Sequence, residues 1–297
     1  MIEISNQHIP VMLNEVLDYL NIRNEGTYVD CTFGNGGHSR AILGKLEKGK
    51  LVAFEWDEKT VQIIQNDKFF SAPNFYLVKD NFANLEEQFK SLNLREVDGF
   101  LFDLGISSYQ LAEESRGFSY RLDSPLDMRI SQEEKLKAED VINNYPLEKL
   151  ADIFYYYGEE RKARLIARKI CYWRDKQRIT RTQQLVGIVA SCFPRKKNKH
   201  PARKIFQALR IFVNKELENL SKALESAFKY VALEGRIIVI SYHSLEDRIV
   251  KQIFKKYNSL GEFQVITKKP LMPIQKEISV NYKARSAKMR IIQRLKV

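Results

Sequence analysis

The chain has 297 residues, of which 44% are hydrophobic and 11% are aromatic, and its formal net charge is +12 at pH 7. This length holds one large domain or two modest ones with a proper buried core. The sequence has no apolar signal segment and no apolar run near the roughly 18 residues that a membrane span needs, which argues against a membrane protein. Its three cysteines, Cys31, Cys171 and Cys192, are widely spaced, which argues against a disulfide framework and a zinc centre. We therefore expect a cytoplasmic protein without a metal site, and the excess of cations favours a polyanionic partner over mere solubility.

The first third of the chain alternates strand-like apolar runs with helical patterns. Strands are expected over 27–33, 50–56, 74–80 and 97–104, and helices over 38–46 and 58–65. Near-continuous apolar strands that are separated by helices predict a parallel sheet covered on both faces. The fold class is therefore predicted to be α/β.

A long gap separates the fourth strand from the next convincing strand, over 235–242. It spans about 130 residues, where an ordinary strand–helix–strand crossover needs about 30. Helical patterns are expected within it over 147–157, 159–173 and 182–192, followed by one long helix over 201–230. We therefore predict a helical insertion, residues 120–205, in a discontinuous α/β domain formed by 1–119 and 206–297. The domain is expected to end with a helix over 245–256 and strands over 263–268 and 289–295.

A glycine turn follows the first predicted strand. Gly34, Gly36 and Gly37 allow a tight turn and a close approach of the backbone to a ligand. Glu55 ends the second predicted strand about 20 residues after Gly34, which is the spacing of the ribose-binding carboxylate in nucleotide folds. Ser39 stands where a dinucleotide pattern has its third glycine. The turn therefore indicates a nucleoside-containing ligand more than it indicates NAD.

The ends of the predicted strands carry the other polar candidates. Ligands bind beyond the carboxyl ends of parallel strands, so these ends are expected to converge on one site: 32–38, 55, 80–82, 103–110 and 241–244. Asp103 and Gln110 can hold a polar ligand there, although a carboxylate before a turn also caps backbone amides. His243 can be a base, a substrate contact or a packed loop histidine. A serine triad is not expected, because no nucleophile elbow is present.

The predicted insertion is rich in arginine, lysine and aromatic residues. Arg116, Phe118 and Arg129 can contact a flipped base, or they can pack inward as a hinge. Cations are concentrated over 161–181 and again over 195–204, where RNA phosphates would release counterions on contact. A solvated basic helix is the competing interpretation. The RNA-contact candidates of the second cluster are Arg195, Lys196, Lys197, His200, Arg203 and Lys204.

Eight motifs occur in one order along nearly the whole chain, and the clearest reads D-C-T-F-G-N-G-G-H-S over 30–39. The others lie at 8–11, 103–111, 116–120, 125–129, 200–214, 241–251 and 284–288. Together they closely resemble the bacterial small-subunit rRNA (cytosine-N(4))-methyltransferase family, also called MraW or RsmH. The resemblance implies a Rossmann-like S-adenosylmethionine-dependent methyltransferase sheet, with the helical insertion between strands four and five recognising RNA and capping the site.

The same resemblance implies the ligands. S-adenosyl-L-methionine is the expected methyl donor, and the acceptor is the exocyclic N(4) amine of one cytidine in the decoding centre of 16S rRNA, cytidine 1402 in rRNA numbering. The small ribosomal subunit is the expected partner. The implied cofactor contacts are Gly36, Gly37, His38, Glu55, Phe82, Asp103 and Gln110. Asp103 is the first candidate for accepting a hydrogen bond or proton from the amine, and His243 is the second.

Three other functions remain open from the sequence alone. A nicotinamide-dependent dehydrogenase uses the same type of sheet, but Ser39 and the basic insertion argue against it. A DNA amino-methyltransferase usually has an Asp/Asn/Ser-Pro-Pro-aromatic tetrapeptide after its fourth strand, and this chain has none. An RNA-binding protein without activity would bind no cofactor. A titration with NADH and with S-adenosylmethionine separates the dehydrogenase from a methyltransferase.

Overall fold

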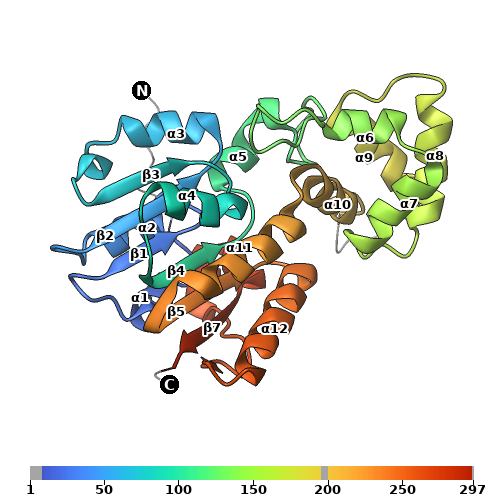
Figure 1. Ribbon diagram of the computed structural model, residues 1–297. Coiled ribbons are helices and arrows are strands. Elements are labelled where there is room, and N and C mark those ends of the chain that lie inside the picture. The colour runs from blue at the N-terminus through green and yellow to red at the C-terminus, as the bar shows by residue number, and fades with distance from the viewer. Residues whose placement is uncertain (1–8, 195–199, 296–297) are drawn as a thin grey trace. The chain divides into compact units, whose positions relative to one another are not determined.

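Seven strands form one mixed sheet in the order β3-β2-β1-β4-β5-β7-β6 in the computed structural model, which describes residues 9–194 and 200–295 (Figure 1). The strands are β1 (Thr27–Asp30), β2 (Lys50–Glu55), β3 (Phe75–Lys79), β4 (Val97–Asp103), β5 (Val231–Ser241), β6 (Phe263–Val265) and β7 (Lys288–Arg294). Strands β1 to β5 run parallel to one another, and β7 is antiparallel to both β5 and β6. The predicted Rossmann-like α/β fold class is confirmed.

The sheet is buried on both faces because its central strands are apolar at nearly every position. In β2, Val52 and Phe54 belong to the hydrophobic cluster of one face, and Leu51 and Ala53 belong to that of the other. This alternation follows from the pleat, which turns successive side chains to opposite faces. A run without polar positions therefore requires helices on both sides.

The helices that supply this cover form two groups. One face packs against α4 (Leu85–Ser91), α11 (Glu216–Tyr230) and α12 (Ser244–Ser259). The other packs against α1 (Leu13–Leu20), α2 (Gly37–Leu43) and α3 (Glu58–Gln65). The short 3₁₀ helices η1 (Lys68–Ser71), η2 (Phe82–Asn84) and η4 (Tyr282–Ser286), with α13 (Gln275–Val280), lie in the loops. The helices α1 and α4 were not predicted from the sequence.

The contacts between residues divide the chain into two compact units. The sheet unit comprises Met1–Gly105 and Leu217–Val297, and the helical unit comprises Ile106–Glu216. The helices of the second unit are α5 (Ser108–Ala112), η3 (Glu114–Arg116), α6 (Ala138–Asn144), α7 (Leu147–Tyr156), α8 (Ala163–Arg174), α9 (Thr182–Ala190) and α10 (Arg203–Asn214) (Figure 1). This unit contains the predicted insertion 120–205 and extends beyond both its ends.

Buried polar contacts explain why the helical unit reaches past 120–205. The guanidinium of Arg116 donates to the carbonyl of Ile130 at 2.8 Å. At the other end, Asn214 donates to the carbonyl of Met128 at 2.8 Å and accepts from the amide of Ile130 at 2.8 Å. Both side chains are almost fully buried. Each therefore ties a flanking segment to the same loop of the unit.

The single long helix expected over 201–230 is wrong, because two helices occupy this range. The helix α10 ends at Asn214, and α11 begins at Glu216. Between them Lys215 adopts a left-handed conformation with φ 51° and ψ 37°. A left-handed residue cannot continue a right-handed helix, so the helix ends there.

No helix among the described residues is both long enough and apolar enough to span a membrane.

Candidate functional site

The carboxylate of Glu55 lies beside the glycine turn, as the sequence spacing predicts. The amide of Gly34 donates to Oε2 of Glu55 at 3.1 Å, and the amides of Trp56 and Asp57 each donate to Oε1 at 2.9 Å. Glu55 is the last residue of β2, which pairs in parallel with β1. An ionised carboxylate offers about four acceptor positions, and three are used here. One position remains for a ligand hydroxyl.

Burial controls the protonation of Glu55. Its side chain has little contact with solvent, and this burial raises the pKa of Glu55 to about 8. The three backbone amides oppose that rise, since hydrogen bonds to the charged form favour it. A ligand hydroxyl that donates to this group favours the charged form further. Ligand binding and deprotonation of Glu55 are therefore expected to be coupled.

The glycine turn needs its glycines for the protein's own packing. Gly36 has φ +74°, and a Cβ there would lie 2.5 Å from the ring of Phe33. A Cβ on Gly37 would lie 2.3 Å from Cγ of Pro10. Both positions therefore exclude a side chain before any ligand is considered. The close approach of a ligand was the predicted reason for glycine at these positions, and packing within the protein is a second reason.

A buried aspartate braces the start of α2, and the sequence analysis missed it. Asp30 accepts a hydrogen bond of 2.6 Å from the hydroxyl of Ser39 and one of 3.1 Å from the amide of Thr32. Its side chain is fully buried, and burial raises the pKa of Asp30. Ser39, which breaks the dinucleotide pattern, thus serves to join β1 to α2. A polar residue at the end of a buried strand was the available signal.

Asp103 connects the ends of three strands. Its amide donates to Oγ1 of Thr32, after β1, at 2.7 Å, and its Oδ1 accepts a hydrogen bond of 2.6 Å from the hydroxyl of Tyr242, after β5. Burial raises the pKa of Asp103, and a nearby histidine and the Tyr242 hydroxyl oppose the rise. The predicted convergence of the ends of β1, β4 and β5 is confirmed. Tyr242 lies in the predicted strand end 241–244, but it was not singled out as a site residue.

His38 lies in the first turn of α2 and faces Asp103. Its Nδ1 is 3.6 Å from Oδ2 of Asp103, and its Nε2 is 3.0 Å from the carbonyl oxygen of Val11. Because a carbonyl only accepts, Nε2 carries the proton in that contact. Nδ1 and Oδ2 are too far apart for a direct hydrogen bond. Oδ2 is the Asp103 oxygen that Tyr242 leaves available.

Phe82 and Gln110, the two remaining cofactor candidates, lie in different units. Phe82 begins η2 just after β3, and its ring packs edge-on against Phe102, with centroids 6.0 Å apart. Gln110 lies in α5 of the helical unit and forms a capping box, in which its Oε1 accepts from the amide of Ser107 at 3.0 Å. Its side chain is thus used in folding. Its role as a cofactor contact stays a prediction.

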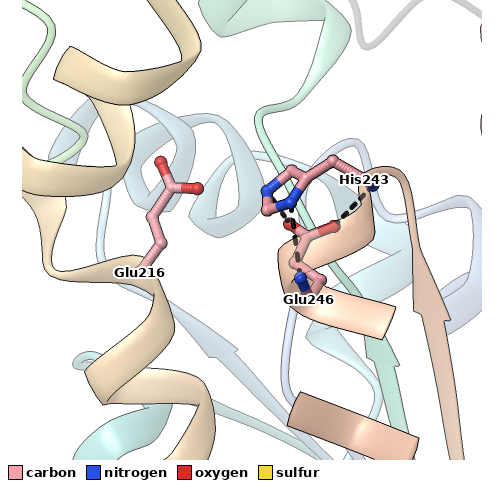
Figure 2. Close-up of side chains that lie close together, drawn as sticks. All are labelled: Glu216, His243 and Glu246. Carbon is pink, nitrogen blue, oxygen red and sulfur yellow. Dashed lines mark hydrogen bonds and ion pairs between the residues drawn. The ribbon is translucent and has the colours of Figure 1, made fainter. Parts of the chain in front are cut away.

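His243 caps α12 and is packed against Glu246. Its Nδ1 accepts a hydrogen bond of 3.3 Å from the amide of Glu246, and the carboxylate of Glu246 accepts from the amides of Tyr242 and His243. Figure 2 shows the imidazole lying against that carboxylate. Nε2 is 3.0 Å from Oε1 of Glu246, but their orientation is unsuitable for a hydrogen bond. Glu216, also drawn there, belongs to the helical unit and pairs with Arg210 at 2.8 Å (Figure 2).

The residues predicted to contact RNA at the start of the insertion have little exposure to solvent: Arg116 and Phe118 are buried, and the side chain of Arg129 is 11% exposed. Arg116 is 2% exposed, and its Nε pairs with Glu113 at 3.0 Å. The ring of Phe118 is buried, and the guanidinium of Arg129 binds both oxygens of Asp127 at 2.8 and 2.7 Å. This burial agrees with the alternative of inward packing. It does not support an RNA contact by these three side chains.

The second predicted RNA cluster is described only in part. Arg195, Lys196 and Lys197 lie outside the described residues. His200 stacks on Tyr120 with centroids 4.6 Å apart, and Lys204 donates to the carbonyl of Glu159 at 2.5 Å. Arg203 is exposed.

The donor set at the sheet edge suits a nucleoside ligand. Glu55 has one acceptor position left for a ribose hydroxyl, and Oδ2 of Asp103 is available for a donor such as an amine. Beside them, Gly105 has φ +104°, and a Cβ there would meet no atom closer than Cδ2 of Tyr242, at 3.8 Å. The space beside Gly105 is therefore not filled by neighbouring side chains. This is the edge where nucleotides bind in open parallel sheets.

Comparisons with known proteins agree with this chemistry. The model of a family described as the MraW methylase family matches residues 5–295. Among solved structures, an rRNA methylase from Streptococcus thermophilus is 13% identical with a TM-score of 0.46, covering 97% of this chain and 99% of that one. A candidate rRNA-methylase from Clostridium thermocellum is 12% identical with a TM-score of 0.48, covering 97% and 100%.

The two structural similarities are too weak to contribute to the assignment, which rests on the family match. That match extends over nearly the whole chain and includes both units. The chain therefore belongs to the MraW methylase family and is a methyltransferase.

Proposed function

We propose that the protein transfers a methyl group from S-adenosyl-L-methionine to the exocyclic N(4) amine of one cytidine in the decoding centre of 16S rRNA, cytidine 1402 in rRNA numbering. The family match supports methyl transfer. The observation that carries the choice of donor is the pair formed by Glu55 and Gly34 at the carboxyl edge of the sheet. The net charge of +12 supports an RNA acceptor.

The sheet unit would hold the donor through residues on neighbouring strands. Glu55 accepts a ribose hydroxyl, the turn at Gly36 and Gly37 follows the methionine portion, and Phe82 packs on the adenine. The sulfonium of the donor supplies an already activated methyl carbon. The protein's main task is therefore alignment of the acceptor amine, which can contribute about 7–11 kcal/mol in favourable cases.

Asp103 is the residue that we propose to accept a hydrogen bond from the cytosine amine. The amine is a poor nucleophile because its lone pair is delocalised into the ring, and an acceptor on its hydrogen localises that pair. Tyr242 holds one oxygen of Asp103 and leaves the other, Oδ2, available. Burial raises the pKa of Asp103, which makes its carboxylate a stronger proton acceptor.

His243 is less suited to that role. Its Nδ1 already accepts a hydrogen bond from the Glu246 amide, so the neutral ring carries its proton on Nε2. No lone pair of the imidazole is then left for the substrate. We therefore propose that His243 positions the start of α12, next to Tyr242.

The helical unit is proposed to bind the RNA. Arg116 and Phe118 are buried within it, and Arg129, whose side chain is 11% exposed, is paired with Asp127, so we exclude these three residues from the proposed contact surface. Arg203, which is exposed, stays in the proposal together with His200 and Lys204. The expected partner is 16S rRNA, either as free RNA or within the small ribosomal subunit.

The direct test is transfer of labelled methyl groups to small ribosomal subunits that lack the modification, followed by mapping of the labelled nucleotide. Label on the N(4) amine of the decoding-centre cytidine is expected. Label on another nucleotide would disprove the proposed acceptor, and no transfer to any RNA would disprove the function. A parallel titration with NADH, which should not bind, tests the dehydrogenase alternative.

A further inference from the structure

The outer face of α8 carries arginines that no carboxylate neutralises. Residues 161–178 contain eight lysines and arginines and a single acidic residue, Asp175. Among the described residues, the exposed side chains of Arg161, Arg164 and Arg168 have no hydrogen-bond or ion-pair partner. A solvated basic face usually pairs several of its cations with nearby acids. This face therefore keeps an uncompensated positive charge.

Other cations of the same segment are used by the fold, which makes the three arginines distinct. Lys162 donates to the carbonyl of Cys192 at 3.0 Å, and Lys169 donates to the carbonyl of Ser191 at 3.0 Å. Arg174 donates to the carbonyl of Tyr145 at 2.7 Å. These contacts are directed toward other parts of the helical unit. The arginines without partners are directed to solvent.

Two exposed aromatic rings continue this face. Tyr172 is 55% exposed and Trp173 is 46% exposed, and their centroids are 5.7 Å apart at an interplanar angle of 83°. Nζ of Lys176 lies 4.3 Å from the centroid of Tyr172 and 5.7 Å from that of Trp173. Since Arg164, Arg168 and Tyr172 follow at intervals of four residues, they lie along one side of the helix.

The rings of Tyr172 and Trp173 lie outside the buried side of α8. That side consists of Ala163, Ile166, Ala167 and Ile170. Tyr172 and Trp173 leave about half of their surface in solvent, so a large apolar area stays available to a ligand. Large exposed aromatic side chains beside unpaired cations are a feature of surfaces that bind single-stranded nucleic acids, where bases stack on the rings and phosphates meet the cations.

We propose that this α8 platform, formed by Arg164, Arg168, Tyr172, Trp173 and Lys176, binds an unpaired segment of the substrate RNA. The inference rests on the proposed RNA substrate and extends it to a mode of recognition. Bases would stack on Tyr172 and Trp173, while the phosphates contact the two arginines. A duplex keeps its bases stacked and paired, so it offers no free base face to the rings. An acidic protein surface could pair with the arginines but would not need the rings. Single-stranded RNA can use both the rings and the arginines.

Direct binding of RNA to the full chain tests this platform. The probes are a fluorescently labelled, unstructured RNA of about ten nucleotides, within the usual site size, the duplex of the same sequence, and inorganic polyphosphate. The double variant Y172A/W173A is compared with Y155A/Y156A, which removes two tyrosines that are 56% and 63% exposed at the end of α7. All four side chains are largely exposed, and circular dichroism and the Tm verify that the variants fold.

If the platform binds unpaired bases, removal of its rings should weaken binding of single-stranded RNA more than binding of polyphosphate. Y172A/W173A should weaken binding of the single strand at least about fivefold, which corresponds to ~1 kcal/mol for one stacked base, and leave polyphosphate binding unchanged. R164E/R168E should weaken both ligands and reduce the salt slope by about 1.4, because each phosphate contact on a single strand contributes about 0.7. The single strand should also quench the fluorescence of the unmodified protein, and W173F should abolish that quenching.

Three results would overturn the inference. These are unchanged binding of the single strand by Y172A/W173A, an equal loss in Y155A/Y156A, and an equal loss for duplex or polyphosphate. The methyl-transfer assay separates this failure from that of the proposed function. If the unmodified protein methylates subunits while Y172A/W173A binds RNA normally, the platform is wrong and the function stands. If the variant loses RNA binding while no methyl transfer occurs, the function is wrong and the platform stands.

Discussion

The amide of Gly34 and the carboxylate of Glu55 form a hydrogen bond of 3.1 Å that joins the end of β1 to the end of β2. Two further amides bind the same carboxylate, so its position is fixed before any ligand arrives. A fixed acceptor loses little entropy when a ribose binds, and this preorganisation contributes to affinity. The proposed donor site depends on this arrangement.

Removal of the charge on Glu55 should weaken binding of the donor. The variant Glu55→Gln replaces one acceptor oxygen with an amide group that faces backbone N–H donors. Hydrogen bonds to charged groups contribute about 1.5–3 kcal/mol, so the Kd of S-adenosylmethionine should rise at least about tenfold. Isothermal titration calorimetry at pH 9, above the Glu55 pKa of about 8 so that the carboxylate is charged, measures this change. The exposed Glu47→Gln is the control, and an unchanged Kd in E55Q would remove Glu55 from the site.

The affinity for the donor should depend on pH through Glu55. Its pKa is raised to about 8 in the free protein, so the group is mostly protonated at pH 7. A ribose hydroxyl that donates to the carboxylate favours the charged form, and binding should therefore release up to one proton. Affinity should rise with pH up to about 8 and level off above it. Calorimetry in two buffers of different ionisation enthalpy measures the proton release, and E55Q should abolish it.

The same pKa has a consequence for folding. The unfolded chain has the ordinary glutamate value of 4.5, so the folded state binds the proton more tightly. The stabilising contribution is therefore fully present below about 4.5 and is lost as the pH rises through about 8. Urea unfolding at pH 6 and pH 9 should show a smaller loss of stability in E55Q than in the unmodified protein. An equal loss in both would contradict the raised pKa.

The fold and part of the site follow from the sequence because strand ends and their spacing are local features. Gly34 and Glu55 lie together because parallel strands that are adjacent in sequence pair in the sheet. Tyr242 and Asp103 are 139 residues apart and meet only because β4 pairs with β5. The convergence of the strand ends could be predicted, but the contact between these two residues could be predicted only if the order of the strands in the sheet were known.

Other features depend on tertiary structure and give no local signal. The break at Lys215 contains neither glycine nor proline, so the pattern of the two helices reads as one. The direction of the Arg116 side chain also cannot be predicted, because the sequence does not show whether an arginine points to solvent or, as here, to the carbonyl of Ile130. Tyr172 and Trp173 read as part of an amphipathic helix until their exposure is known.

Asp103→Asn should separate binding of the donor from catalysis. If Asp103 accepts the hydrogen of the cytosine amine, the variant binds S-adenosylmethionine with an unchanged Kd while kcat falls by about 10²–10⁴, the usual contribution of a positioned proton acceptor. Tyr242→Phe should lower kcat less, since it removes only the hydrogen bond of 2.6 Å that orients the carboxylate. Loss of donor binding in D103N would instead make Asp103 a cofactor residue only.

Substitution of Gly36 should destabilise the sheet unit. Gly36→Ala places a Cβ at 2.5 Å from the Phe33 ring and at φ +74°, and such strain costs about 1–3 kcal/mol. The matched control is Gly187→Ala in α9, where no atom lies within 4 Å of the new Cβ and the gain in helix propensity is about 1 kcal/mol. Thermal unfolding should show a lower Tm for the first variant only. A Tm for G36A equal to that of the unmodified protein would contradict the observed turn.

Arg116 should prove to be a structural residue of the helical unit. Arg116→Ala leaves the carboxylate of Glu113 and the carbonyl of Ile130 without their buried partner, and loss of a buried ion pair costs about 3–5 kcal/mol. We expect a large fall in Tm, whereas the exposed Arg121→Ala should leave it unchanged. A normal Tm for R116A, together with weaker RNA binding, would restore the role in RNA contact that the sequence suggested.

In the proposed site, the carboxyl edge of this sheet holds the adenosine of a methyl donor beside the acceptor for an amine. A crystal structure of the protein with S-adenosylhomocysteine is the decisive measurement. We expect a ribose hydroxyl within hydrogen-bond distance of Glu55 and the sulfur directed toward Oδ2 of Asp103. A ligand bound elsewhere, or a ribose out of reach of Glu55, would contradict it.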